Sequence, residues 1–252
     1  MLANDTDVEN DTLSVSAPVA DNGGTVSVVG NQISYQPAPN FHGTETITYT
    51  VDDGNGGTDT GTVTVTVAPV NDDPTGTASA ALVDGAEDTP YTVTEAELLQ
   101  GFTDIDGDSL SVSNLVSSSG TVTSNGGGNY TVDPALNYGG TVTLSYDVID
   151  GNGGTVAGTQ TLTLNAVNDP PVSVDDGFTV LEDSAATTID VLGNDTDVEG
   201  HTLTISNVSS DQGGALTVVG NQISYQPAAG FNGVELVTYT VDDGNGGTDT
   251  GT

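Results

Sequence analysis

Thr62-Val63-Thr64-Val65-Thr66-Val67 indicates the fold class of this chain, because threonine and valine alternate in it without interruption. An alternation with period two places every valine on one face, which is typical of a half-buried β-strand. Hydrophobic residues make up 34% of the sequence, which is enough to build packed cores although aromatic residues are few. The sequence therefore predicts a folded all-β protein, although its high net charge is also a feature of disordered chains.

A glycine-rich motif marks an internal repeat. Asp53–Gly57 reads Asp-Gly-Asn-Gly-Gly, and the same five residues recur at Asp150–Gly154 and Asp243–Gly247. The second copy follows the first by 97 residues (150 − 53) and the third follows the second by 93 (243 − 150). A unit of that length has the size of an immunoglobulin-like β-sandwich, and repetition at a fixed period indicates a tandem array.

The repeat predicts three β-sandwich domains in a linear array. Their ranges are residues 1–70 without a first strand, residues 71–167 as a complete domain, and residues 168–252 without a last strand. Residues 1–62 align with residues 191–252 without a gap, so the first and third domains are of one type. We expect Tyr49, Tyr146 and Tyr239, which hold one equivalent position, to lie in the cores.

The middle domain is expected to contain seven strands and one helical turn. A capping box at Thr94–Glu97 predicts the turn, and Asn-Gly and Gly-Gly pairs separate many of the strands. The expected strands lie near Ala78–Leu82, Pro90–Thr94, Ser109–Val116, Thr121–Ser124, Tyr130–Asp133, Thr141–Ile149 and Thr155–Asn165.

The charge of the chain requires a cation from outside it. The sequence has 36 acidic residues and no lysine or arginine, so its formal charge is −36. A folded body with that charge repels itself, and no internal basic residue can offset the repulsion. Clustered carboxylates bind Ca²⁺ through oxygen ligands, so calcium is the simplest candidate. Nucleic acid and direct contact with an anionic membrane are excluded as partners, since both need basic patches.

Acidic motifs recur in every unit. One is Asp104-Ile105-Asp106-Gly107-Asp108, whose counterparts are residues 7–11 and 197–201. A second follows a long strand, at Asp52-Asp53-Gly54 and its copies, and a third is the linker Asn71-Asp72-Asp73-Pro74 and its copy at residues 168–171. An early Glu-Asp pair, Glu87-Asp88, is a fourth element. Alternating carboxylates around a glycine turn place several oxygens on one side of a loop, as a calcium ion requires.

These motifs, in their order along the chain, resemble cadherin repeats. The chain is most similar to the bacterial cadherin-like or immunoglobulin-like tandem repeats of giant calcium-dependent adhesins, which are exported by type I secretion (RTX-type). The run from Tyr35-Gln36-Pro37 through Phe41-His42-Gly43 to Tyr49–Gly57 is characteristic of that group. The resemblance covers the whole chain.

The resemblance implies calcium ions between successive domains. Ile149 stands where Asp52 and Asp242 stand in the other units, so we expect fewer ions or weaker binding at the first junction. The implied ligands are Asp52, Asn71, Asp72, Asp73, Asp104, Asp106, Asp108 and Asp150 for the first two units, and Glu87, Asn168, Asp169, Asp195, Asp197, Glu199 and Asp242 for the second junction.

The sequence favours a structural role over catalysis. The only histidines, His42 and His201, are replaced by Asn232 and Asp11 at the equivalent positions, whereas a general base would not be exchanged so freely. We therefore interpret the chain as the non-enzymatic stalk of an adhesin on a bacterial cell surface, for attachment or biofilm formation. Its partners are neighbouring repeats and other copies of itself.

Two alternatives stay open at this point. A self-assembling filament or surface-layer protein would complete its open sheet edges by strand exchange between chains. A glycan-binding module would need exposed aromatic residues, and the chain has no tryptophan and 8 tyrosines, most of them at repeated, core-like positions.

Overall fold

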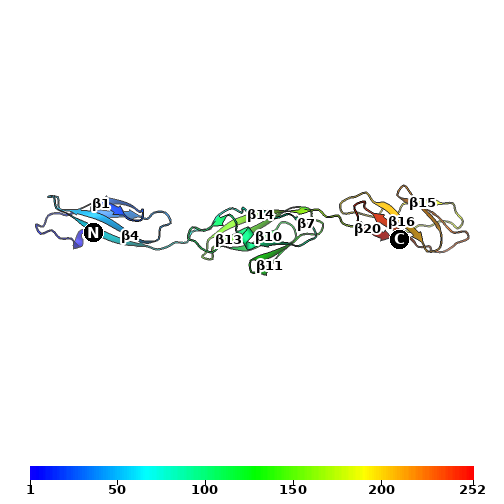
Figure 1. Cartoon of the computed structure of the whole chain (residues 1–252), viewed down its shortest axis with the longest axis horizontal. Coiled ribbons are helices and arrows are strands. Elements are labelled where there is room, and N and C mark those ends of the chain that lie inside the picture. Colours follow the sequence, from blue (N-terminus) through cyan, green and yellow to red (C-terminus); the bar gives the residue numbers. More distant parts are fainter. The chain divides into compact units, whose positions relative to one another are not determined.

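The computed structural model describes all 252 residues, and the long regular elements are β-strands (Figure 1). The helices are the single turns η1 (Leu2–Asn4) and α1 (Glu95–Leu98). The strands are β1 (Ser14–Ala20), β2 (Thr25–Val29), β3 (Gln32–Gln36), β4 (Gly43–Asp52), β5 (Thr58–Val67), β6 (Thr75–Gly76), β7 (Gly85–Ala86), β8 (Tyr91–Thr94), β9 (Phe102–Thr103), β10 (Ser111–Ser117), β11 (Thr121–Gly126), β12 (Asn129–Asp133), β13 (Gly140–Ile149), β14 (Thr155–Asn165), β15 (Thr187–Ile189), β16 (Thr204–Ser210), β17 (Ala215–Val219), β18 (Gln222–Gln226), β19 (Val237–Asp242) and β20 (Thr248–Gly251). The predicted all-β class is confirmed.

The chain divides into two compact units. The first contains residues 1–78, 101–113 and 147–158, and the second contains residues 79–100, 114–146 and 159–252. In the first unit, β4 is the central strand of the sheet β1-β4-β5, and β2 and β3 form a hairpin. The alternating run Thr62–Val67 lies in β5, where each valine is less exposed than the threonines beside it. The predicted strand is therefore present, with its valines on the inner face.

The second unit contains sheets that repeat this pattern. Its sheet β16-β19-β20 corresponds to β1-β4-β5, and its sheet β15-β18-β17 contains the counterpart of the β2–β3 hairpin. The pairing of β1 with β4 shifts register between Ser16 and Val19, and the pairing of β16 with β19 shifts between Ile205 and Asn207. The shared irregularity shows that the two sequence copies build the same sheet.

The middle of the chain confirms six of its seven predicted strands and corrects one. Residues 78–82 are not a strand, and only the two-residue strands β6 and β7 flank them. The backbone of this segment bonds outside any sheet ladder. Ser79 N–H donates to the Gln100 carbonyl at 2.9 Å, and the Gln160 side chain donates to the carbonyl of Ala80. The other strands form the sheets β10-β13-β14-β7 and β11-β12-β8.

The capping box at the helical turn is confirmed. The side chain of Thr94 accepts a hydrogen bond from the Glu97 N–H at 3.3 Å, and the Glu97 carboxylate accepts one from the Thr94 N–H at 2.8 Å. These reciprocal bonds satisfy two backbone donors at the start of α1. Leu98, the last residue of α1, is fully buried, so the turn contributes to the core.

The three equivalent tyrosines lie in the cores, as predicted, with 6%, 3% and 1% of Tyr49, Tyr146 and Tyr239 exposed. The Tyr146 hydroxyl donates to the carbonyl of Leu98 at 2.7 Å, and the Tyr239 hydroxyl donates to that of Val191 at 3.0 Å. Both bonds span 48 residues, so they tie the inner strands β13 and β19 to segments far away in sequence. A buried hydroxyl needs such a partner.

Candidate cation-binding clusters

Three loops of equivalent sequence, which we call the acidic loops, hold carboxylates close together: residues 7–11, 104–108 and 197–201. In each acidic loop, Oδ1 of the first aspartate accepts a hydrogen bond from the backbone N–H four residues later, which closes the loop into a turn. The N···O distances are 2.9 Å at Asp7, 3.2 Å at Asp104 and 2.8 Å at Asp197. The bond leaves Oδ2 of that aspartate available for another partner.

The second element is the strand-end loop, the Asp-Gly-Asn-Gly-Gly motif at residues 53–57, 150–154 and 243–247. Its aspartate accepts backbone N–H groups of its own loop. Oδ1 of Asp150, for example, accepts from Asn152 at 2.7 Å and from Gly154 at 3.0 Å. The last glycine of the loop is required, since a Cβ at Gly154 would lie 2.2 Å from Oδ2 of Asp150. The backbone thus fixes the carboxylate in place.

An asparagine of the linker completes the surroundings of two of these carboxylates. Asn71 Nδ2 donates to Oδ2 of Asp150 at 2.7 Å, and Asn168 Nδ2 donates to Oδ2 of Asp243 at 2.6 Å. These bonds are the largest of the effects that lower the pKa of Asp150 and of Asp243 below the usual value of an aspartate. Both carboxylates are therefore ionised at neutral pH, although only 4% and 3% of the two residues are exposed.

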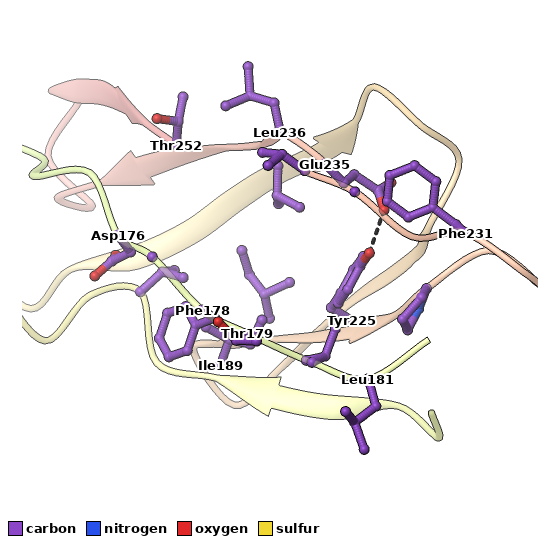
Figure 2. Close-up of a pocket in the computed structure, with 18 of the residues that line it drawn as sticks. Asp176, Phe178, Thr179, Leu181, Ile189, Tyr225, Phe231, Glu235, Leu236 and Thr252 are labelled. Atoms are coloured by element: carbon purple, nitrogen blue, oxygen red, sulfur yellow. Dashed lines mark hydrogen bonds between the residues drawn. The ribbon is translucent and has the colours of Figure 1, made fainter. Parts of the chain in front are cut away.

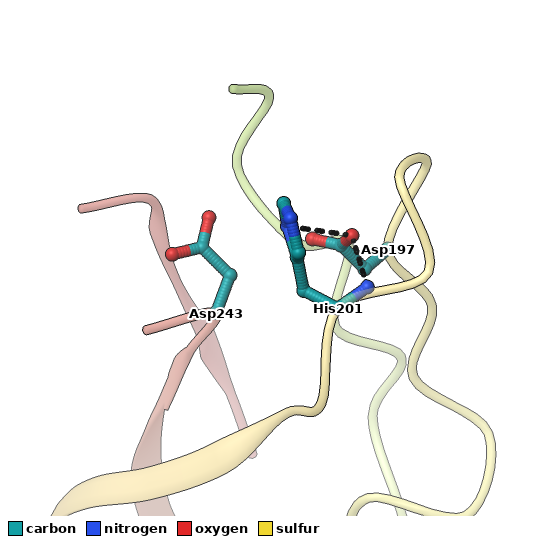
Figure 3. Close-up of side chains that lie close together, drawn as sticks. All are labelled: Asp197, His201 and Asp243. Atoms are coloured by element: carbon teal, nitrogen blue, oxygen red, sulfur yellow. Dashed lines mark hydrogen bonds and ion pairs between the residues drawn. The ribbon is translucent and has the colours of Figure 1, made fainter. Parts of the chain in front are cut away.

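Four clusters of side chains bring their ligand atoms within 4.8 Å of one another. Two of them, one with Asp53 and one with Asp243, join an acidic loop to a strand-end loop. Three clusters consist of carboxylates alone, and the fourth includes an imidazole (Figure 3). The clusters are Asp7, Asp11 and Asp53; Asp104, Asp106 and Asp108; Glu87, Asp169 and Glu199; and Asp197, His201 and Asp243.

Several oxygens in and beside the clusters are buried and have no hydrogen-bond partner. They include Oδ2 of Asp104, Asp169 and Asp197 within the clusters, and Oδ1 of Asn168 beside them. A buried carboxylate oxygen without a partner is unfavourable, and the chain has no lysine or arginine to pair with it. Calcium takes six to eight oxygen ligands from carboxylates, amide carbonyls and water. The three carboxylate clusters therefore fit calcium in the chemistry of their ligand atoms.

The cluster of Glu87, Asp169 and Glu199 joins segments that are far apart in sequence. Glu87 follows β7, Asp169 lies in the second linker, and Glu199 lies in the third acidic loop. Glu87 is 4% exposed, and its Oε1 accepts a hydrogen bond from the Val167 N–H at 2.7 Å. This bond fixes the carboxylate beside the linker.

Asp195 lies near other carboxylates but outside the four clusters. Its Oδ1 accepts a hydrogen bond from the Val174 N–H at 2.8 Å, and its Oδ2 is buried without a partner. Burial raises the pKa of Asp195 above the usual value, and the charges of Asp176 and Asp249 raise it further. The environment of Asp195 therefore disfavours its charged form unless a cation is present.

The clusters bring together seven of the fifteen residues that the sequence predicts as ligands. Three more, Asn71, Asn168 and Asp150, lie in the hydrogen-bond network that supports them. Asp72 donates its N–H to Oδ2 of Asp106 at 2.8 Å, and Oδ1 of Asp73 lies 2.9 Å from the position that a Cβ on Gly154 would take. The seven are Glu87, Asp104, Asp106, Asp108, Asp169, Asp197 and Glu199.

Asp52 and Asp242 lie outside the clusters, and their neighbours Asp53 and Asp243 lie inside them. Oδ1 of Asp52 accepts the Gly54 N–H at 2.6 Å, and Oδ1 of Asp242 accepts the Gly244 N–H at 2.8 Å. Sequence reasoning also missed Asp7, Asp11 and His201. The sequence did contain one indication that Asp53 and Asp243 are the functional residues. An aspartate stands at this position in all three copies, at 53, 150 and 243, whereas the preceding position is isoleucine at residue 149.

A separate feature of the second unit is an apolar groove of about 570 Å³. Phe178, Ile189 and Tyr225 are among its lining residues, and the Tyr225 hydroxyl bonds to Glu235 within it (Figure 2). The segment Gly233–Val237 along this groove corresponds to Gly43–Ile47 of β4, which pairs with Val63–Val67 of β5.

Solved structures similar to this chain include several cadherins. Mouse cadherin-23 domains EC22-24 match with a TM-score of 0.55 and 17% identity, over 95% of this chain and 83% of that chain. Protocadherin gamma B2 extracellular cadherin domains 1-5 match with a TM-score of 0.53 and 15% identity, over 94% of this chain and 51% of that chain. At these identities the likeness establishes the fold alone.

An endo-fucoidan hydrolase from glycoside hydrolase family 107 also matches, with a TM-score of 0.33 and 18% identity. The match covers 95% of this chain and 38% of the hydrolase, and a score that low supports no conclusion about activity. No curated protein matches the chain. No helix of the structure has the length and apolar character needed to cross a lipid bilayer.

Family models match nearly the whole chain. The model of the cadherin-like domain matches residues 70–165, and that of the bacterial Ig domain matches residues 1–66 and 168–252. Domains of both kinds are non-catalytic and typically extracellular, and cadherin-like domains generally bind calcium. The chain therefore belongs to the bacterial Ig domain family and carries a cadherin-like domain at residues 70–165.

Proposed function

We propose that this chain is a run of structural extender repeats from a large adhesin on a bacterial cell surface, stiffened by calcium. Its domains are residues 1–70, 71–167 and 168–252, and the second and third domains begin with the linkers at residues 71–74 and 168–171. The repeats hold a terminal binding domain away from the cell, in a type I-secreted protein that serves attachment or biofilm formation. Extracellular calcium supplies the positive charge that the sequence lacks.

The cluster of Glu87, Asp169 and Glu199 carries this proposal. Glu87 belongs to the segment that matches the cadherin-like domain, and Asp169 and Glu199 belong to the segment that matches the bacterial Ig domain, Asp169 at its second residue. Three carboxylates within 4.8 Å repel one another unless a cation joins them. A calcium ion bound here links both domains to the connecting segment and restricts its motion.

The acidic loops support the same interpretation. In the absence of a cation, the charge of −36 favours expanded arrangements of the chain. Calcium bound at the three carboxylate clusters neutralises their carboxylates and satisfies the buried oxygens of Asp104 and Asp169. Calcium that binds the folded form alone also stabilises it against unfolding.

Calorimetric titration with calcium, combined with small-angle scattering, tests the proposal. We expect several ions to bind, the melting temperature to rise, and the radius of gyration to change between chelator and millimolar calcium. The variant Glu199→Gln removes one ligand of the cluster at the second linker and abolishes part of the change in the radius of gyration. Asp59→Asn removes an equal charge outside all four clusters and serves as the matched control. If neither calcium nor chelator alters the melting temperature and the radius of gyration, the proposal is wrong.

A further inference from the structure

The fourth cluster differs from the others in one ligand. At the last position of the acidic loop the chain has Asp11 and Asp108 in the first two copies, and it has His201 in the third. The loop geometry is unchanged, since His201 N–H donates to Oδ1 of Asp197 at 2.8 Å as Asp11 N–H donates to Asp7 at 2.9 Å. An imidazole therefore replaces a carboxylate on the same backbone frame.

The side chains of this cluster face one another (Figure 3). The Asp197 side chain is 1% exposed, and its Oδ1 lies 3.3 Å from Nδ1 of His201. Oδ2 of Asp197 and Nδ1 of His201 are both buried without a hydrogen-bond partner. Asp243 completes the cluster, with one ligand atom of each residue within 4.8 Å of the others. The cluster thus presents a buried, unpartnered carboxylate oxygen and a buried ring nitrogen to a common space.

Asp243 is held in position for this role. Its Oδ1 accepts the N–H groups of Asn245 at 2.7 Å and Gly247 at 3.0 Å, and its Oδ2 accepts from Asn168 at 2.6 Å. Hydrogen bonds of this kind orient the carboxylates that bind metals, and their loss weakens metal binding. The third ligand is therefore fixed by the strand-end loop and the linker.

The chemistry of this set differs from that of a calcium site. Calcium takes oxygen ligands, whereas an imidazole nitrogen with carboxylates suits ions of the first transition series, of which zinc binds more tightly than manganese. We propose that Asp197, His201 and Asp243 form a site for a zinc-type transition-metal ion. This site is distinct in selectivity from the carboxylate clusters elsewhere in the chain, and the proposal goes beyond calcium binding by the repeats.

The chain contains its own reference for this proposal. Asp7, Asp11 and Asp53 occupy the equivalent positions of the first copy and offer oxygen atoms alone. His201→Asp converts the fourth cluster into that type, and Asp11→His converts the first cluster into the type of the fourth. His42→Asn is the matched control, because it removes the other histidine in favour of the residue at the equivalent position 232.

Zinc titration of the calcium-saturated protein, followed by calorimetry and by NMR of the two imidazole rings, tests the site. We expect one zinc ion to bind and to shift the signals of His201 but not those of His42. His201→Asp weakens zinc binding at least about tenfold, since loss of even an outer-shell partner has an effect of that size. His42→Asn leaves zinc binding unchanged, and Asp11→His adds a second zinc ion.

Equal zinc affinity in His201→Asp and in the unaltered protein would overturn the proposal, as would unshifted His201 signals at zinc saturation. A parallel calcium titration without zinc separates this result from the proposed function. If calcium binds but zinc does not, the proposed zinc site is rejected and the calcium-stiffened stalk is not. If zinc binds but calcium does not, the calcium-stiffened stalk is rejected and the zinc site is not.

Discussion

The hydroxyl of Tyr225 donates a hydrogen bond to Oε2 of Glu235, and valines fill the equivalent places in the middle of the chain. Glu235 stands four residues before Tyr239, as Val142 stands four residues before Tyr146. Val132 and Val142 are 1% and 0% exposed. One sandwich position thus accepts either a hydrogen-bonded polar pair or an apolar pair, consistent with the rule that a buried polar group needs its partner.

Tyr225 and Glu235 are energetically coupled, so replacing both residues costs less than the sum of the two single replacements. Glu235→Val leaves the Tyr225 hydroxyl without its acceptor, and it also removes the acceptor of the Gly214 N–H, which lies 2.7 Å from Oε1. We expect a loss of about 1–3 kcal/mol in the free energy of unfolding. The double variant with Tyr225→Val loses less than the sum of the two single variants, because the residues are coupled. Denaturant unfolding at a fixed calcium concentration measures the cycle, and strictly additive losses would contradict the coupling.

The same pair predicts a loss of stability at alkaline pH. Burial and the neighbouring Glu235 raise the pKa of Tyr225 from 10.0 to about 12. The folded protein therefore holds this proton more tightly than the unfolded chain does. This difference contributes to the stability of the folded protein, and the contribution is fully present below pH 10 and is lost as the pH rises through about 12. Tyrosinate absorbance and thermal melts at increasing pH measure the loss of stability. The variant Tyr225→Phe abolishes the part of that loss that comes from Tyr225. A normal ionisation of Tyr225 in the folded protein is the contrary outcome.

A glycine in β20 is required by the ring of Tyr239. A Cβ at Gly251 would lie 2.4 Å from Cζ of Tyr239, whereas a Cβ at Gly177 would meet nothing within 4 Å. We expect Gly251→Ala to lower the free energy of unfolding by about 1–3 kcal/mol, because overpacking shifts the buried ring. Gly177→Ala serves as the control and leaves the stability nearly unchanged. Equal melting temperatures for both variants would show that the ring moves aside without cost.

Much of the fold could be predicted from local patterns. The alternation in Thr62–Val67, the capping box at Thr94 and the repeated tyrosines each specify their structure through neighbouring residues or the repeat period, and all three are confirmed. The prediction of a strand at residues 78–82 was wrong, because the backbone of this segment bonds to Gln100 and Gln160, which are close to it in space but not in sequence. The residues of the segment itself carry no information about such partners.

The candidate sites could be predicted in outline but not in every ligand. Repetition identified the acidic loops and linkers, because carboxylates at these spacings recur in each copy. It did not reveal which of two adjacent aspartates turns toward the acidic loop. Asp52 ends β4 and Asp53 opens the strand-end loop, so the direction of each side chain depends on the hydrogen bonds of that loop.

Asp53 and Asp52 therefore provide a direct test of the candidate calcium ligands. Asp53→Asn removes a ligand of the Asp7 cluster and weakens the acceptor of the Asn55 N–H at 2.7 Å and the Gly57 N–H at 2.9 Å. We expect calorimetry to count one calcium ion fewer at the same free calcium concentration.

Asp52→Asn removes the same charge one residue away, so any effect of overall electrostatic attraction is equal in the two variants. Its side chain bonds to the Gly54 N–H and lies outside the four clusters, so the number of ions stays the same. If Asp52→Asn instead removes the ion and Asp53→Asn does not, the strand-end residue is the ligand. The strand-end loop then turns over when calcium binds, because Asp52 must give up its bond to Gly54 in order to reach the ion.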